Sequence, residues 1–141
     1  MTTYLALLLA TSAQAITPEV VGLHIGSHHF TPAPKHIGTW NDNNPGVYAR
    51  WSNGVTVGTL RNSERRQSTY LAMTWETPRR YGLSASVTAG GITGYSKPVS
   101  PLLTFGASAS VTRDAAIRLS YLPKSNKQGS AAIHLSIERS F

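Results

Sequence analysis

Apolar and polar residues alternate without a break over the last segment of the chain, 130–141, which ends on an aromatic residue. In a β-strand, successive side chains point to opposite faces, so residues of one parity share a face. The apolar face of this segment carries Ile133, Leu135, Ile137 and Phe141. The segment is therefore predicted to be a strand with one apolar and one polar face.

Seven earlier segments have the same strand chemistry, in which β-branched and aromatic residues are bounded by turn formers. They are Val20–Phe30, Val47–Ser52, Val55–Asn62, Ser68–Glu76, Gly82–Ile92, Pro101–Val111 and Ala115–Leu122. No convincing helical periodicity remains between them. The pattern predicts an all-β fold of eight strands.

The connections between these segments alternate in length. Asn53-Gly54 is a strong hairpin signal, and the connections 77–81 and 112–114 are also short. The other connections are mostly longer and rich in Pro, Gly, Asn and Lys; they comprise 31–46, 63–67, 93–100 and 123–129. Short turns on one rim and longer loops on the other are the plan of an eight-stranded antiparallel up-and-down barrel that crosses a membrane.

The predicted strands have one apolar face and one face of small or polar side chains; Leu83, Ala85 and Val87 alternate with Ser84 and Ser86. Small polar side chains fit the narrow lumen of an eight-stranded barrel and leave the apolar ones to face lipid. A soluble barrel or sandwich with its apolar faces inward is the alternative, because periodicity does not distinguish inside from outside.

Two further observations bear on that choice. Aromatic residues near strand ends favour the transmembrane barrel, and these are Trp51, Trp75, Tyr81, Tyr95 and Tyr121. Against it, the segments 47–52 and 55–62 are shorter than the roughly 9 to 11 residues that a tilted spanning strand needs. We expect the transmembrane barrel, formed by a single domain over residues 16–141.

Residues 1–15 are predicted to be a signal peptide. An apolar run, Leu5–Ala10, precedes Ser12-Ala13-Gln14-Ala15, a small-x-small pattern that signal peptidase would cut after Ala15. No Lys or Arg precedes the apolar run, so a buried N-terminal segment is the alternative. With a leader, the protein is expected in the outer membrane, or in the periplasm if the barrel is soluble.

The formal charge of +7 predicts an anionic partner. Basic residues gather in the longer connections, and we expect those that bind lipopolysaccharide to be Lys35, Arg65, Arg66, Lys97, Lys124 and Lys127. Nucleic acid is not expected as a partner, because aromatic residues do not interleave with basic ones on a strand face and a leader directs export. The chain has no cysteine, which excludes disulfides and thiolate chemistry.

The polar face of the last segment carries the densest candidate chemistry. His134 and Ser136 are two residues apart on one strand, so their Cα atoms lie roughly 6.6 Å apart, within reach of a serine–histidine hydrogen bond. Glu138 shares this face and is a candidate third member of a catalytic site.

If the barrel closes, its first strand lies beside the last one and extends this polar cluster in the lumen. The cluster is then expected to include His24, His28, Arg50 and Arg118. It is interpreted in three ways: as a hydrogen-bond network that braces the lumen, as a hydrolase or acyltransferase site, or as a metal site. His-x3-His on a strand does not direct both rings to one ion, so we expect no metal and no cofactor.

The closing segment, with its terminal Phe141, resembles the last strand of bacterial outer-membrane barrels, although Arg139 departs from that pattern. The architecture is similar to that of the eight-stranded outer-membrane enzymes that remove or add acyl chains on lipid A. His134-Leu135-Ser136 matches the His-x-Ser pair of the deacylases among them. This resemblance implies a lipid A deacylase or acyltransferase.

A second resemblance covers most of the mature chain. The segments 42–46, 61–64 with 68–70, and 90–95 are similar to a pattern in small uncharacterised exported proteins of bacteria and phages. It implies no activity. The leading hypothesis is therefore a monomeric, non-enzymatic outer-membrane barrel that contacts lipopolysaccharide. The lipid A enzyme and a soluble periplasmic ligand-binding barrel are the alternatives.

Overall fold

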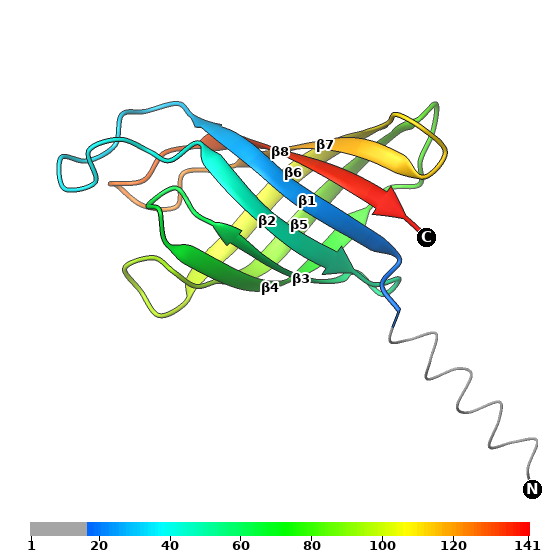
Figure 1. Cartoon of the computed structure of the whole chain (residues 1–141), viewed down its shortest axis with the longest axis horizontal. Coiled ribbons are helices and arrows are strands. Elements are labelled where there is room, and N and C mark those ends of the chain that lie inside the picture. Colours follow the sequence, from blue (N-terminus) through cyan, green and yellow to red (C-terminus); the bar gives the residue numbers. More distant parts are fainter. Residues whose placement is uncertain (1–16) are drawn as a thin grey trace, which may run out of the picture.

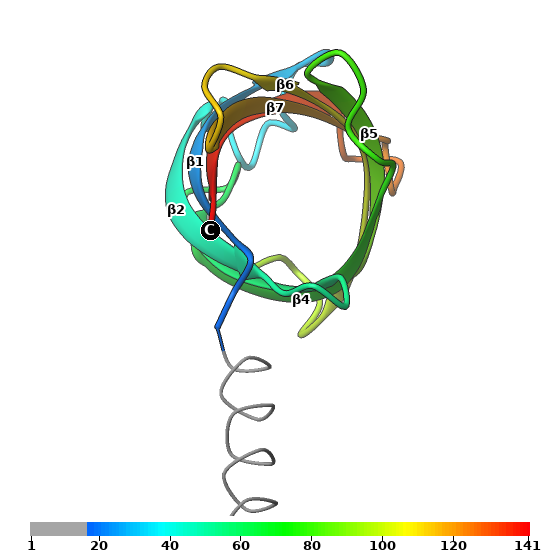
Figure 2. The ribbon, with the colours of Figure 1, turned by 90° about the vertical axis from the view of Figure 1, so that its right-hand side faces the viewer.

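The computed structural model describes residues 17–141, which form one closed barrel of eight antiparallel strands in sequence order (Figures 1 and 2). The predicted leader, residues 1–15, lies outside the described residues. The strands are β1 (Val20–His29), β2 (Asn43–Arg50), β3 (Val55–Arg61), β4 (Gln67–Glu76), β5 (Leu83–Ile92), β6 (Ser100–Ser110), β7 (Ala115–Leu122) and β8 (Ala132–Ser140). This confirms the predicted fold class. No helix within residues 17–141 is long and apolar enough to span a membrane.

Closure places β1 beside β8, with Val20 paired to Ser140 and His29 paired to Ala132. The short connections β2–β3, β4–β5 and β6–β7 lie at the same end of the barrel as the C-terminus (Figure 1). We call this end the turn rim. The other four connections form the opposite end, the long-loop rim. All of them except the β3–β4 connection are longer than the connections of the turn rim, so connection length identified the two ends of the barrel with that one exception.

β2 begins at Asn43, earlier than its predicted start at Val47. The intervening Pro and Gly are typical of a loop, but Pro45 falls where the β1–β2 register shifts between the pairs His24–Gly46 and Gly26–Asn43. Proline is tolerated at such a bulge because the ladder does not need its missing N–H. The earlier start gives β2 eight residues, close to but still below the roughly 9 to 11 residues of a tilted spanning strand.

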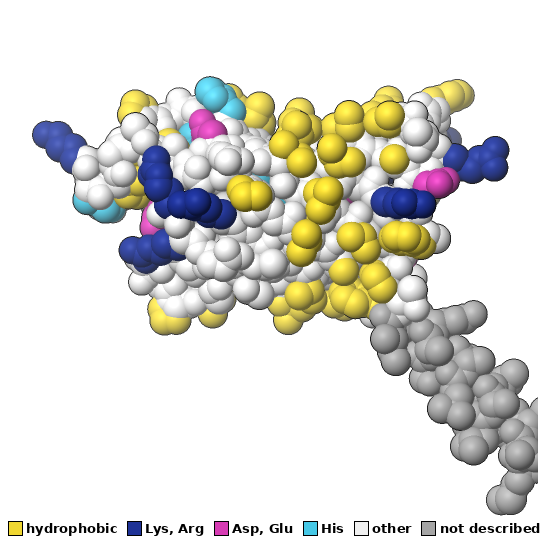
Figure 3. All heavy atoms as spheres, in the orientation of Figure 1, with side chains coloured by type: hydrophobic (Ala, Val, Ile, Leu, Met, Phe, Trp, Pro, Cys, Tyr) yellow, Lys and Arg dark blue, Asp and Glu magenta, His cyan; other side chains and the backbone are white. Residues whose placement is uncertain are grey.

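The outer face of the barrel carries an apolar belt nearest the turn rim (Figure 3). The belt consists of the exposed side chains Leu23, Ile25, Val47, Val57, Leu71, Trp75, Leu83, Leu103, Phe105, Val111, Ile117, Leu119, Tyr121, Leu135 and Ile137. The apolar faces therefore point outward, as predicted for the transmembrane barrel. Along β6 the belt extends from Leu103 to Val111, which at about 3.3 Å per residue and a tilt near 40° gives a height of roughly 20 Å.

Two tyrosines inside the barrel lie flat against glycines on neighbouring strands. Tyr48 pairs with Gly22 and Gly58, and Tyr70 pairs with Gly58. A Cβ atom built on Gly22 would overlap the ring of Tyr48, and one built on Gly58 would overlap the ring of Tyr70. The missing side chains thus make room for two large rings in a narrow lumen.

The substitution Gly58→Ala is expected to destabilise the barrel by about 1–3 kcal/mol, because the new methyl group displaces the Tyr70 ring in a packed interior. The urea midpoint of the refolded protein measures this, followed by the migration of unboiled protein on a gel. Ala107→Val, which adds bulk on the exposed outer face, is the control. Equal midpoints for both variants would contradict the proposed packing.

Candidate functional site

Four charged residues join across the turn-rim half of the lumen. We call Arg50, Glu76, Arg118 and Glu138 the ion cluster. Arg118 contacts Glu138 through Nε at 2.7 Å and Nη2 at 3.0 Å, and its Nη2 also lies 2.8 Å from Glu76 Oε2. Arg50 makes the same two links, 2.8 Å from Nη2 to Glu76 Oε2 and 3.3 Å from Nη1 to Glu138 Oε1. Two guanidinium groups therefore alternate with two carboxylates.

Polar groups from the surrounding strands complete the ion cluster. The Tyr48 hydroxyl donates to Glu138 Oε1 at 2.7 Å, and Arg118 Nη1 donates to the Ser86 hydroxyl. Arg79, from the turn rim, donates to the Ser108 hydroxyl at 2.6 Å and lies 3.7 Å from Glu76. Because Glu138 is only 3% exposed, these contacts replace the water that its carboxylate has lost. The ion cluster is therefore a charge-balanced floor of the lumen.

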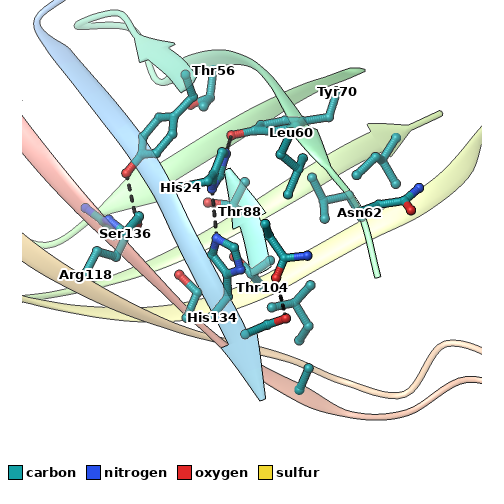
Figure 4. A pocket seen from close by; sticks show the side chains of 18 of the residues that line it. His24, Thr56, Leu60, Asn62, Tyr70, Thr88, Thr104, Arg118, His134 and Ser136 are labelled. Atoms are coloured by element: carbon teal, nitrogen blue, oxygen red, sulfur yellow. Dashed lines mark hydrogen bonds between the residues drawn. The ribbon is translucent and has the colours of Figure 1, made fainter. Parts of the chain in front are cut away.

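The candidate catalytic residues His134, Ser136 and Glu138 all line the lumen, yet each has a different partner. His134 Nε2 lies 2.9 Å from Nδ1 of His24. The Ser136 hydroxyl lies 3.3 Å from the Tyr48 hydroxyl, and Ser136 is only 2% exposed. Within residues 17–141, then, the structure assembles no serine–histidine–carboxylate relay (Figure 4).

Of the two histidines expected on the luminal face of β1, only His24 lies there. Its Nδ1 contacts His134 and its Nε2 lies 2.9 Å from the Tyr70 hydroxyl. The prediction for His28 was wrong: the register of β1 against β8 shifts between His24 and Gly26, and the extra residue turns His28 to the outer face. There it is exposed and contacts Phe30.

His29 takes the inward direction instead of His28. Its Nδ1 lies 2.7 Å from Asp42 Oδ1, and its ring stacks on Trp40 with centroids 4.9 Å apart. The sequence contained one signal for this change, a glycine inside a strand, which often marks a bulge. Among the described residues, no group of three or more His, Cys, Asp or Glu side chains could hold a metal ion.

The segments 61–64 with 68–70 and 90–95, which the sequence analysis singled out, meet at the long-loop rim around Asn62, which is 1% exposed. Its side-chain oxygen accepts from the backbone N–H groups of Glu64 and Arg66, at 2.9 and 3.0 Å. Its amide donates to the Ser68 hydroxyl and the Gly94 carbonyl, both at 2.9 Å. Asn62 therefore ties the β3–β4 loop to the β5–β6 loop, which gives this part of the pattern a structural role.

A cavity of about 130 Å³ lies in the lumen above the ion cluster (Figure 4). Its walls include Leu60, Ile92, Leu102 and Leu122, and its lining extends as far as Ser63 and Tyr95 in the long-loop rim. Burial raises the pKa of the Tyr95 hydroxyl, so this side chain stays neutral. Local sequence patterns do not reveal this cavity, because its lining comes from strands far apart in the chain.

The long-loop rim brings together all six residues that were predicted to bind lipopolysaccharide, and all six are exposed. They are Lys35, Arg65, Arg66, Lys97, Lys124 and Lys127, contributed by the four long connections. Arg65 is partly engaged, since its guanidinium donates to the carbonyl and hydroxyl of Thr39 at 2.7 and 2.9 Å. Only Asp42 and Glu64 oppose this charge on the same rim.

No protein-family model and no curated protein match this chain. A solved structure described as "De novo design of transmembrane beta-barrels" is similar to it, with a TM-score of 0.65 and 14% sequence identity. The similarity covers 89% of this chain and 98% of the designed one. At this level of identity the similarity supports the fold alone, and the chain is an eight-stranded antiparallel barrel that resembles a designed transmembrane barrel.

The substitution Glu138→Gln is expected to lower the free energy of unfolding by about 3–5 kcal/mol, because it leaves two buried guanidinium groups with Glu76 as their one shared carboxylate. Urea unfolding of the refolded protein measures the loss. Glu64→Gln makes the same chemical change on the long-loop rim and is the control, with an expected effect within about 0.5 kcal/mol. If both variants unfold at the wild-type midpoint, the ion cluster does not stabilise the barrel.

Proposed function

We propose that this protein is an outer-membrane barrel that acts as a non-enzymatic envelope protein and binds lipopolysaccharide through its long-loop rim. The observation that carries the proposal is the apolar belt. An exposed apolar surface that encircles a barrel has no partner in water, and in bilayers it is matched by the hydrocarbon layer. The roughly 20 Å height of the belt is close to the band of about 25 Å that is usual for outer-membrane barrels.

The margins of the belt also support a membrane location. Trp75 and Phe141 lie towards the turn rim and are exposed, as aromatic residues are at membrane interfaces. Arg139, which departs from the apolar pattern of the last strand, lies here too, with its guanidinium carbon 5.6 Å from the centre of the Phe141 ring. A long basic side chain at the edge of the belt can extend its charge to the headgroups.

The basic long-loop rim is the basis for proposing lipopolysaccharide as the partner. Phosphate groups accept charge-assisted hydrogen bonds from lysine and arginine. Lys97, Lys124 and Lys127 are exposed in the long connections, which lie on the outer-leaflet side of the belt in the proposed orientation. The lumen contributes little to this attraction, because the charges of its ion cluster are balanced.

The contacts of the predicted catalytic residues favour a non-enzymatic role. A serine nucleophile needs a base within hydrogen-bond reach and access to its substrate. Ser136 is buried inside the lumen against Tyr48, while His134 contacts His24. Glu138, the third candidate, is held by two arginines. The contacts of these three side chains are therefore those of residues that pack the lumen.

A membrane location predicts that brominated lipids quench the fluorescence of Trp75 in reconstituted protein. Trp75 is 58% exposed on the outer face, where bromine atoms on acyl chains can approach it. The experiment uses a variant that retains only this tryptophan, Trp40→Phe with Trp51→Phe. Its control retains only Trp40, which is bound in the long-loop rim by its hydrogen bond to the Thr31 carbonyl. Equal quenching of the two variants, or none, would exclude this orientation.

Removal of charge from the long-loop rim is expected to weaken the binding of lipopolysaccharide at least tenfold. The variant is Lys97→Gln with Lys124→Gln and Lys127→Gln, and binding to purified lipopolysaccharide is measured with barrel reconstituted in neutral lipid. The control, Arg80→Gln with Arg113→Gln and Arg139→Gln, removes the same charge from the turn rim and is expected to bind like the wild type.

Two outcomes of this experiment would count against the proposal. If both triple variants lose affinity equally, net charge rather than the long-loop rim attracts lipopolysaccharide. Mass spectrometry of lipid A from membranes that contain the wild-type barrel tests the non-enzymatic part, for which an unchanged mass is expected. Loss or gain of an acyl chain that disappears in Ser136→Ala would show an enzyme.

A further inference from the structure

Above the belt, the side of the barrel formed by β3 and β4 reverses its polarity. On the hairpin of β3 and β4, the outward side chains Thr59, Arg61, Gln67 and Thr69 are polar, and Figure 3 shows few apolar atoms on this half of the visible face. Inside the same half, Leu60, Ile92, Leu102 and Leu122 line the cavity. Polar outside and apolar inside is the arrangement of soluble ligand-binding barrels. We call this part of the lumen the cup.

We propose that the cup binds a small neutral amphiphile, with one ring-sized apolar part and one hydroxyl group, which enters from the long-loop rim. The inference rests on the lumen alone and does not depend on lipopolysaccharide binding. The ion cluster closes the floor of the cup on the turn side, whereas Ser63 and Tyr95 place its upper wall in the loops. Entry is therefore expected from the loop side.

The volume of the cavity sets the size of the ligand. An apolar cavity of about 150 Å³ in another protein stays dry and takes up benzene. The cup, at about 130 Å³, has room for a group of that size but not for a long acyl chain. Its leucine and isoleucine walls favour an apolar ring or a short branched chain, because neither offers a hydrogen bond.

The charge of the lining indicates a neutral ligand. The ionic groups that reach the cavity, Arg50, Arg118 and Glu138, are paired with one another. His24 and His134 share a hydrogen bond, so at least one facing nitrogen is unprotonated. A buried ligand charge would have no free counter-charge here and would lose its hydration.

Two hydroxyl groups in the cavity lining are available to bind the polar end of the ligand. Thr56, Thr74 and Thr88 form a ladder across three strands, with Oγ1 atoms 2.9 Å apart at each step. The next luminal positions, Thr104 on β6 and Ser120 on β7, also line the cavity, and for the described residues their side chains make no hydrogen bond within the protein. A ligand hydroxyl could bind to these two groups, of which Ser120 is the register partner of His134 on the neighbouring strand β8.

Benzyl alcohol is the probe for this proposal, added to the refolded barrel in lipid nanodiscs. Methyl NMR signals of Leu60, Ile92 and Leu102 are expected to shift and to saturate, with a Kd of about 1 mM or tighter. Benzoate, which is of similar size but charged, is expected to leave them unchanged. Shifts that grow linearly without saturation would indicate partition into the lipid and would overturn the proposal.

Variants separate the cup from the rest of the barrel. Ala132→Phe fills the cavity and is expected to abolish saturable binding, whereas Ala109→Phe adds the same ring on the belt and is expected to retain it. Where Ala132→Phe does not refold, Leu102→Trp serves the same purpose. Saturable binding that survives in a folded, filled variant would place the ligand elsewhere and overturn the proposal.

The hydroxyl contact has its own test. Thr104→Val keeps the shape of the side chain and removes its hydrogen bond, so it is expected to weaken benzyl alcohol binding about three- to tenfold and to spare toluene. The measurement is the ratio of the Kd values for benzyl alcohol and toluene. A general loss of structure would weaken the binding of both ligands and leave this ratio unchanged. Equal weakening of both ligands would contradict the assigned orientation.

Discussion

The balance of charge inside a narrow barrel is the constraint on which the rest of this structure depends. Eight strands enclose too little space for water to solvate a free ion, so each luminal charge needs a protein partner. Arg50 and Arg118 meet this need through Glu76 and Glu138, and the four residues come from four different strands. The ion cluster therefore braces β2, β4, β7 and β8 across the lumen, and it closes one end of the barrel.

The alternation of inward and outward residues along the strands produces two different environments in one barrel. The parity of inward and outward residues continues along β4, where Thr69 and Leu71 both point outward while Ser68 and Tyr70 point inward. The polarity of the inward and of the outward side chains changes along the strand. Near the turn rim the outward positions are apolar and surround the ion cluster. Near the long loops the outward positions of the β3–β4 hairpin are polar, whereas Leu103 and Tyr121, beside the cup residues Leu102 and Leu122, stay apolar and exposed.

Sequence reasoning could place all eight strands and their faces, because a period of two is visible in local sequence. It could not place features that depend on contacts between strands. Pro45 looks like part of a loop until the shifted register of β1 and β2 is known. The bulge after His24 reversed the direction of His28, since one added residue exchanges the two faces of a strand. The inward direction of Glu76 could be predicted, because it is two residues from the inward-facing Thr74 on the same strand. Nothing in the sequence indicated that it pairs with Arg50.

The serine–histidine pair failed for a physical reason that extends to other narrow barrels. Two inward residues on one strand are held roughly 6.6 Å apart at Cα and point in parallel directions. Side chains from the flanking strands β1 and β7, and from β2 beyond β1, come closer to these residues and make shorter contacts. His134 accordingly meets His24, Ser136 meets Tyr48, and Glu138 meets Arg118. Polar pairs at i and i+2 in such a barrel therefore indicate side-chain packing between neighbouring strands before they indicate catalysis.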